Sequence, residues 1–181
     1  FVKDFSLKEL QQLDAGLNFS SEYKGERIPT LEDVLVAAKG KKQLNIELKT
    51  AGKMYPGLEN KVIDLIKEFK MEKEVMITSF DHHRIYEVNE LTSSIETGLI
   101  IWGNPTLLEE QLLYSGATNL SMAVPFLTTE FVETHVKQGR KVIGWTPNTS
   151  KEIEYTKQIH PEIIICTDFP EHVNKVLVNH V

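Results

Sequence analysis

Six short runs of apolar and β-branched residues punctuate the chain. Each run is short enough for one β-strand, and most are too uniformly apolar for a strand with one face in water. Such runs are typical of parallel strands that are buried on both faces. The predicted strands are 44–48, 75–80, 97–102, 118–122, 141–146 and 163–167.

The segments between these runs have helical periodicity, and residues that typically begin or end a helix lie at their ends. Thr30 is a predicted N-cap before acidic residues, and Gly40 is placed to end that helix. Asp81 is a predicted N-cap, and a capping-box pattern at Ser6 predicts a short helix near the start. The predicted helices after Gly40 cover 58–69, 82–91, 105–115, 128–138, 150–159 and 170–178.

Strands and helices therefore alternate, with successive strands starting 21 to 31 residues apart. This regular alternation predicts an α/β fold with a parallel sheet. An open doubly wound sheet would normally have a glycine-rich loop after its first strand, and none is present. A closed (β/α)8 TIM barrel has eight strands and typically about 250 residues, which leaves this chain about two units short. The periodicity alone leaves both architectures open.

Composition limits the function classes. The 181 residues are 41% hydrophobic, as is usual for a single globular domain. Their net charge of −6 argues against a broad nucleic-acid-binding surface, which would be basic. The single cysteine, Cys166, excludes an intramolecular disulfide and a cysteine-rich zinc site. No apolar run is long enough to span a membrane. Because the first residue is Phe1 instead of Met, we expect the natural N-terminus to lie upstream; a cytoplasmic location is favoured, and a secreted or cell-surface one stays open.

The most informative polar side chains lie on the first predicted strand. Side chains alternate along a strand, so Asn45, Glu47 and Lys49 share one face, opposite an apolar face that suits helix packing. In a barrel this polar face points into the interior near the carboxyl ends of the strands, where barrel enzymes build their sites. A buried carboxylate and ammonium are costly unless they are paired or bind a ligand. We therefore favour a functional site over a structural Glu47–Lys49 ion pair.

Other strand ends give weaker signals. Ser79 and Phe80 end the second predicted strand and are candidates for substrate contact, although Ser79 would equally serve as a helix cap. Trp145 ends the fifth strand, where a large aromatic side chain either walls a pocket or packs in the core. Asp168 is a predicted cap of the last helix, and Cys166 a small core residue. The six histidines form no ligand cluster, since the adjacent His82 and His83 diverge on a helix. The other four, at positions 135, 160, 172 and 180, are expected on exposed helical positions.

Several motifs together resemble the glycerophosphodiester phosphodiesterase family. The resemblance extends over nearly the whole chain, from about residue 10 to residue 171, and its first half is specific. The motifs are GERIPTLEDVL at 25–35, LNIELK at 44–49, ITSF at 77–80, GWT at 144–146 and CTDFP at 166–170.

The resemblance implies a (β/α)8 barrel that hydrolyses glycerophosphodiesters to glycerol 3-phosphate and an alcohol with the help of Ca²⁺ or Mg²⁺. It implies that Glu47 is a metal ligand and that Lys49 is a catalytic cation on the substrate phosphate. Trp145 would line the pocket near the glycerol or the alcohol. Ser79 and Phe80 stay candidates for substrate contact because of their position at a strand end. The chemistry is consistent, since a hard cation prefers carboxylate oxygens and a phosphodiester needs its charge neutralised.

The sequence also departs from the family pattern. It contains none of the family's H-R-G, E-x-D and H-D motifs, which carry the general acid and base and two metal ligands. We therefore expect a C-terminal fragment, in which residues 28–181 form strands three to eight and residues 1–27 belong to a family-specific insertion. We expect this chain alone to be inactive.

Two alternatives stay open. The chain could be a non-catalytic, degenerate family member that binds phosphodiesters or a partner. It could also derive from another phosphodiesterase of the same superfamily, such as a phospholipase C or a sphingomyelinase D. In either case an open six-stranded barrel exposes two strand edges, so we expect an accompanying segment or self-association through these edges.

Overall fold

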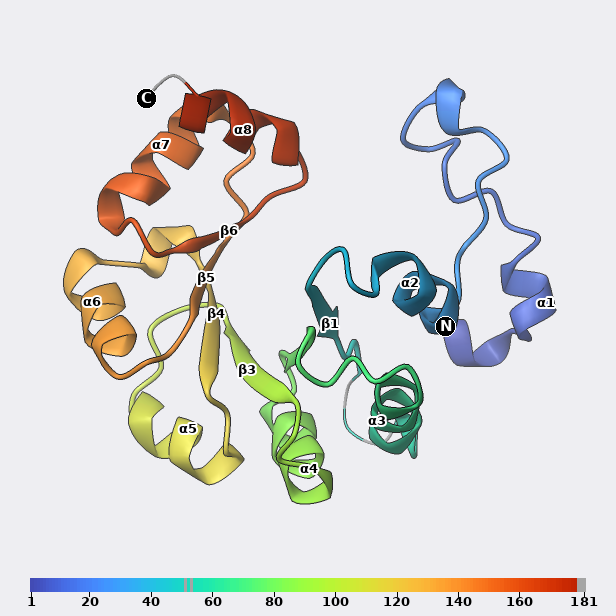
Figure 1. Cartoon of the computed structure of the whole chain (residues 1–181), viewed down its shortest axis with the longest axis horizontal. Coiled ribbons are helices and arrows are strands. Elements are labelled where there is room, and N and C mark those ends of the chain that lie inside the picture. Colours follow the sequence, from blue (N-terminus) through green and yellow to red (C-terminus); the bar gives the residue numbers. More distant parts are fainter. Residues whose placement is uncertain (51, 53, 179–181) are drawn as a thin grey trace.

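Six parallel strands form one sheet, in the order in which they occur along the chain. The computed structural model describes residues 1–50, 52 and 54–178. The sheet curls into a half-barrel, with the helices on its outer side (Figure 1). The strands are β1 (Leu44–Glu47), β2 (Val75–Ser79), β3 (Glu96–Ile101), β4 (Asn119–Ala123), β5 (Val142–Trp145) and β6 (Ile164–Cys166).

The helices alternate with these strands as the sequence predicts, which confirms the α/β fold. The caps at Thr30 and Asp81 are confirmed, because each side chain accepts a hydrogen bond from a backbone N–H of the first turn. The helices are α1 (Leu7–Leu10), α2 (Leu31–Ala38), α3 (Leu58–Glu68), α4 (His82–Leu91), α5 (Leu108–Ser115), α6 (Thr129–Lys137), α7 (Ser150–Ile159) and α8 (Pro170–Val178).

The start of α5 differs from the prediction. The helix begins at Leu108 and not at Pro105, because Leu107 has a left-handed backbone with φ of 58°. The side chain of Gln111 donates instead to the carbonyl of Thr106, which lies in the preceding turn. The end of α5 agrees with the prediction, since Gly116 adopts the left-handed conformation that favours glycine (φ 71°).

The two faces of the sheet have different roles. Alternate side chains such as Ile77 and Leu99 are fully buried in the core between the sheet and the helices. The inner face is mixed: Thr78 Oγ1 donates to Asn45 Oδ1 at 2.9 Å, while Met76 and Ile143 line the same side near the amino ends of the strands. The alternation on β1 is thus confirmed.

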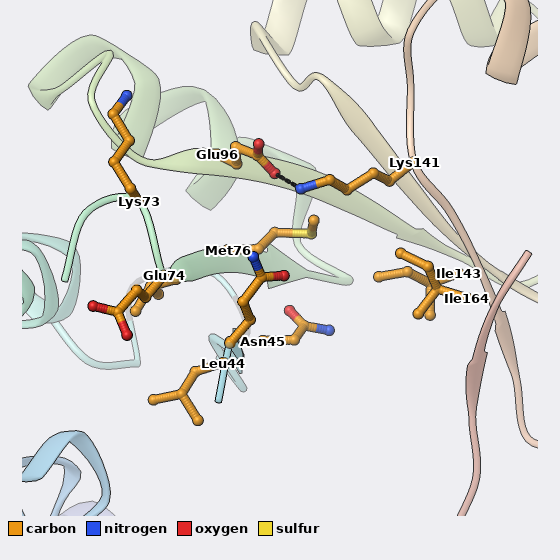
Figure 2. A pocket seen from close by; sticks show the side chains of 11 residues that line it. Leu44, Asn45, Lys73, Glu74, Met76, Glu96, Lys141, Ile143 and Ile164 are labelled. Atoms are coloured by element: carbon orange, nitrogen blue, oxygen red, sulfur yellow. Dashed lines mark hydrogen bonds and ion pairs between the residues drawn. The ribbon is translucent and has the colours of Figure 1, made fainter. Parts of the chain in front are cut away.

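The amino ends of the strands enclose a small cavity of about 170 Å³. Figure 2 shows an ion pair beside it, in which Lys141 Nζ lies 2.6 Å from Glu96 Oε2. Asn45 and Met76 also line the cavity. This end of the sheet is opposite the carboxyl ends, where parallel α/β proteins build their sites.

Residues 1–27 lie outside the strand–helix repeat, beside α2 in Figure 1. They contain the expected capping box at Ser6, which starts α1, and 3₁₀ turns at Val2–Asp4 and Ser21–Tyr23. Asp14 organises this segment, because its carboxylate accepts from the backbone N–H groups of Gly16, Leu17 and Gly25. In the part of the chain that the structure describes, no helix has the length and apolar character to cross a membrane.

β1 and β6 are the two edges of the sheet, and each has one neighbouring strand among the described residues. Ile164 on β6 is 45% exposed, and Cys166 is exposed as well. The expectation that Cys166 is a core residue is therefore wrong. The cause is the edge position of β6, which sequence periodicity does not reveal.

His135 corrects the expectation that the histidines are exposed. It is 4% exposed on α6, its ring packs against that of Phe131 with centroids 4.4 Å apart, and its Nδ1 accepts a hydrogen bond from Arg140 Nη1 at 2.9 Å. Arg140 also binds both carboxylate oxygens of Glu109 at 2.8 Å. Burial lowers the pKa of His135, the charge of Arg140 lowers it further, and Glu109 opposes the shift.

This pKa shift predicts a pH-dependent stability. Below about pH 6.5 the unfolded chain binds a proton at residue 135 before the folded chain does, so the free energy of unfolding falls as the pH drops from there toward the folded pKa. Urea unfolding at several pH values should show this fall. His135→Gln should flatten it, whereas His83→Gln at an exposed position should not. Identical pH profiles for wild type and His135→Gln would contradict the assignment.

Candidate active site

Glu47 and Lys49 lie at the carboxyl end of β1, as the alternation of side chains predicts. Lys49 Nζ is 2.7 Å from Glu47 Oε2, and the exposed fractions of the two side chains are 77% and 27%. They line a pocket of about 380 Å³ with Thr50, Tyr55 and Phe80 among its other walls. We call it the phosphate pocket, after the ligand that the family resemblance implies for Lys49. The pair is thus accessible to a ligand, unlike a fully buried structural ion pair.

The β1–α3 loop that carries Lys49 is tied to β2 and α4. Ser79 Oγ donates to the Leu48 carbonyl at 2.8 Å and accepts from the Asp81 N–H at 3.0 Å. Further along the loop, the Gly52 N–H donates to Asp81 Oδ2 at 3.2 Å. These bonds fix the backbone on both sides of Lys49.

Ser79 adopts the structural role that the sequence offered as an alternative. The side chain is fully buried, both of its hydrogen bonds are to backbone groups, and it does not line the phosphate pocket. Ser79 therefore joins β1 to β2 and supports the turn into α4. Phe80, the next residue, points to the opposite face and does line the pocket.

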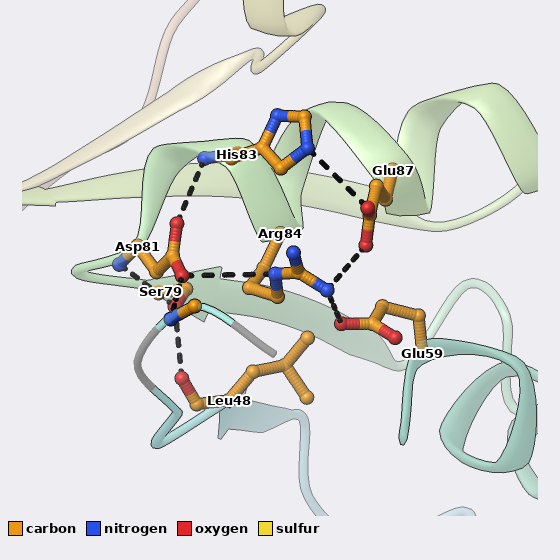
Figure 3. A network of polar contacts seen from close by, with 8 residues as sticks. Leu48, Glu59, Ser79, Asp81, His83, Arg84 and Glu87 are labelled. Carbon is orange, nitrogen blue, oxygen red and sulfur yellow. Dashed lines mark hydrogen bonds and ion pairs between the residues drawn. The ribbon is translucent and has the colours of Figure 1, made fainter. Parts of the chain in front are cut away.

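Asp81 belongs to a charged network around Arg84 on α4 (Figure 3). Arg84 Nη1 lies 3.0 Å from Glu59 Oε1 on α3 and 2.5 Å from Glu87 Oε2, and Nε lies 3.6 Å from Asp81 Oδ2. Burial lowers the pKa of Arg84, but the hydrogen bond that Arg84 donates to Glu59 and the charges of the nearby carboxylates raise it overall. Arg84 therefore stays charged and joins α3 and α4 behind the loop of Lys49.

Aromatic side chains continue the inner face from β2 toward β5. The rings of Phe80 and Trp145 meet edge-on, with centroids 5.7 Å apart, and those of Trp102 and Trp145 lie 5.4 Å apart. Phe126 packs against Trp102 at 6.2 Å. Trp102 is not among the site residues predicted from the sequence, although it ends an apolar run as Phe80 and Trp145 do. That shared position was the signal that could have identified it.

Asp168 connects two loops at the same end of the sheet. Asn148 Nδ2 donates to Asp168 Oδ2 at 2.7 Å, and Asn148 Oδ1 accepts from the Asp168 N–H at 2.9 Å and from Thr167 Oγ1 at 3.0 Å. Thr167 Oγ1 in turn accepts from the Phe169 N–H at 3.1 Å. Thr167, and not Asp168, thus supports the turn into α8, while Asp168 holds the loop that follows Trp145.

The described residues do not make up a metal site by themselves. A hard divalent cation takes six or more oxygen ligands, usually including several carboxylates. Among the described residues that line the phosphate pocket, Glu47 is the one carboxylate. No group of three His, Cys, Asp or Glu side chains within the described part of the chain could hold a metal ion.

Comparisons with known proteins agree with this architecture. A model of the glycerophosphoryl diester phosphodiesterase family matches residues 1–172. A glycerophosphodiester phosphodiesterase from Caldanaerobacter subterraneus subsp. tengcongensis is 36% identical, over 94% of this chain and 70% of the relative.

Solved structures share the fold. A protein from Galdieria sulphuraria matches with a TM-score of 0.83 and 26% identity, over 97% of this chain and 71% of that one. A phosphodiesterase from Oleispira antarctica, solved in complex with its product sn-glycerol-3-phosphate, matches with a TM-score of 0.81 and 23% identity, over 98% and 72%. The half-barrel is therefore the strand–helix arrangement of a TIM-barrel phosphodiesterase. The chain belongs to the glycerophosphoryl diester phosphodiesterase family.

Proposed function

We propose that this chain binds a glycerophosphodiester at the phosphate pocket, as part of an enzyme that hydrolyses it to glycerol 3-phosphate and an alcohol. The observation that carries the proposal is the exposed Lys49 ammonium beside Glu47 at the carboxyl end of β1, in a chain of this family. The related enzyme from Caldanaerobacter is named for this reaction.

In this proposal Lys49 binds the phosphodiester anion. Its ammonium group donates to a non-bridging oxygen and neutralises charge that grows as the phosphorus is attacked. The 77% exposed side chain is free to swing from Glu47 to the phosphate. Phe80 and Trp145 would flank the ester groups, since they wall the same inner face.

Hydrolysis also needs groups that this sequence does not contain. It has no H-R-G, E-x-D or H-D motif, and the phosphate pocket holds a single carboxylate among its described walls. We therefore propose that the general acid, the general base and further metal ligands are supplied outside these 181 residues. Glu47 would then contribute one ligand to the Ca²⁺ or Mg²⁺ ion of the completed site.

Incubation with glycerophosphocholine and Ca²⁺ tests whether this chain binds the substrate without hydrolysing it. The chain should bind glycerophosphocholine, measured by equilibrium dialysis, and release no glycerol 3-phosphate above a no-protein control. Turnover of one per second or faster, an ordinary enzyme rate, would contradict the proposed incompleteness of the site. Failure to bind at millimolar concentrations would contradict the proposed function itself.

Replacing Glu47 should strengthen the binding of sn-glycerol 3-phosphate when no metal ion is present. In buffer with EDTA, Glu47→Gln should bind sn-glycerol 3-phosphate about three- to fivefold more tightly, because removing a negative charge about 4 Å away is worth about 1 kcal/mol in water. Titration of wild type and variant side by side measures this change. Weaker binding by Glu47→Gln would mean that Glu47 acts by orienting Lys49 and not by opposing the anion.

A further inference from the structure

A second pocket lies beside the phosphate pocket, at the carboxyl ends of β3, β4 and β5. We call it the aromatic pocket. It has a volume of about 660 Å³, within the range of small-molecule sites. Its walls include Trp102, Val124, Pro125, Trp145, Glu152 and Tyr155. The two pockets are neighbours, because Phe80 of the phosphate pocket touches Trp145 of the aromatic pocket edge-on at 5.7 Å.

Three aromatic side chains of this pocket come from different parts of the chain. The Trp102 and Trp145 rings are inclined by 47° with centroids 5.4 Å apart, so that their faces form a corner. Tyr155 projects from α7, and both it and Trp102 are more than half exposed. The face of an aromatic ring carries partial negative charge and attracts cations.

The charged wall of the aromatic pocket is negative. Glu152 lies on α7, one turn before Tyr155, and its Oε2 accepts from the N–H groups of Asn148 and Thr149 and from Thr149 Oγ1. The backbone bond from Thr149 is the largest cause of a lowered pKa for Glu152, which is therefore ionised at neutral pH. The described lining contains no lysine or arginine.

We propose that the aromatic pocket binds a quaternary ammonium group, the trimethylammonium of a choline ester, as the alcohol portion of the substrate. A weakly hydrated cation of this kind needs aromatic faces and a nearby negative charge, and it needs no hydrogen-bond acceptors. A primary ammonium would need acceptors for three N–H donors, and a polyol would need many polar partners. The apolar walls of Val124, Pro125 and the tryptophans offer few of either.

Choline and its uncharged isostere 3,3-dimethyl-1-butanol test the proposal. The chain has two tryptophans, and both line the aromatic pocket, so intrinsic fluorescence reports directly on its occupation. Choline should bind about three- to tenfold more tightly than the isostere, because the two differ in charge and hardly in shape. Equal affinities, tighter binding of the isostere, or no binding of choline would overturn the proposal.

Two variants test whether Glu152 and Tyr155 contribute to the binding of choline. Glu152→Gln removes the charge but keeps the capping box, in which glutamine also serves, so it should weaken choline binding about threefold and leave the isostere unchanged. Tyr155→Leu should weaken choline by a similar factor. Tyr114→Leu, at an exposed tyrosine on α5 outside the pocket lining, is the matched control and should change nothing. Equal effects of Tyr155→Leu and Tyr114→Leu would contradict the pocket.

The ammonium site rests on the proposed function, in which the neighbouring phosphate pocket binds the phosphodiester. The two binding claims can nevertheless be tested separately. sn-Glycerol 3-phosphate has no ammonium group, so its binding tests the phosphate pocket alone and should be unaffected by Tyr155→Leu. Choline has no phosphate and tests the aromatic pocket alone. Binding of glycerol 3-phosphate without binding of choline overturns only the ammonium site.

Discussion

Replacing Arg84 with Met should lower the free energy of unfolding by about 3–5 kcal/mol, because it leaves a buried carboxylate without its partner. Glu59 is 4% exposed and contacts Arg84 Nη1 at 3.0 Å. Since domains of this size are stable by about 5–15 kcal/mol, the variant would lose a large part of its stability. Urea denaturation followed by far-UV circular dichroism measures the change.

A surface ion pair provides the matched control for Arg84→Met. Lys137 and Glu133 are 2.7 Å apart on α6, with exposed fractions of 72% and 50%, so Lys137→Met should cost less than about 1 kcal/mol. The double variant Arg84→Met with Glu59→Leu should recover most of the lost stability, since an apolar pair can replace a buried ion pair. Equal losses for Arg84→Met and Lys137→Met would show that the buried network contributes little.

Replacing Lys49 with Met should weaken the binding of sn-glycerol 3-phosphate about 10- to 100-fold. A hydrogen bond to a charged group contributes about 1.5–3 kcal/mol, and each 1.4 kcal/mol corresponds to a factor of ten. The side chain is 77% exposed and makes no core contact, so the fold should be unaffected. Isothermal titration calorimetry measures the affinity.

Lys41→Met is the matched control for Lys49→Met. Lys41 is exposed near the amino end of β1, so the substitution changes the net charge equally at the opposite end of the sheet. Its effect on glycerol 3-phosphate binding should be less than about twofold, as expected for a distant, screened charge. Equal weakening by both variants would mean that general charge, and not a site, governs binding.

Local sequence rules predict the fold well, because each strand and helix carries its own signals. The six apolar runs match the six strands to within one residue at each end, and the caps at Thr30 and Asp81 form as predicted. Alternation along β1 also places Glu47 and Lys49 on the inner face. The same alternation separates Ser79 from Phe80, and applying it to β2 would have assigned Ser79 to the helix side.

The contacts that local rules miss come from packing between distant segments. Arg84 contacts Glu59, 25 residues earlier, and no local sequence pattern around either residue predicts this pair. His135 is buried because α6 packs it beside Arg140 and Glu109. Trp102 joins Trp145 only once β3 and β5 lie on one curved sheet. Such side-chain meetings depend on the curvature of the sheet, which the periodicity of the sequence does not encode.

The location of the bound phosphate tests the central claim most directly. Amide chemical shifts of the ¹⁵N-labelled chain, recorded during a titration with sn-glycerol 3-phosphate, should move at Lys49, Thr50, Phe80 and Trp145, at the carboxyl ends of the strands. Saturable changes are expected there, and none around the cavity at the amino ends, where Glu96 pairs with Lys141. Saturable changes at Glu96 and Lys141 without changes at Lys49 would contradict the central claim.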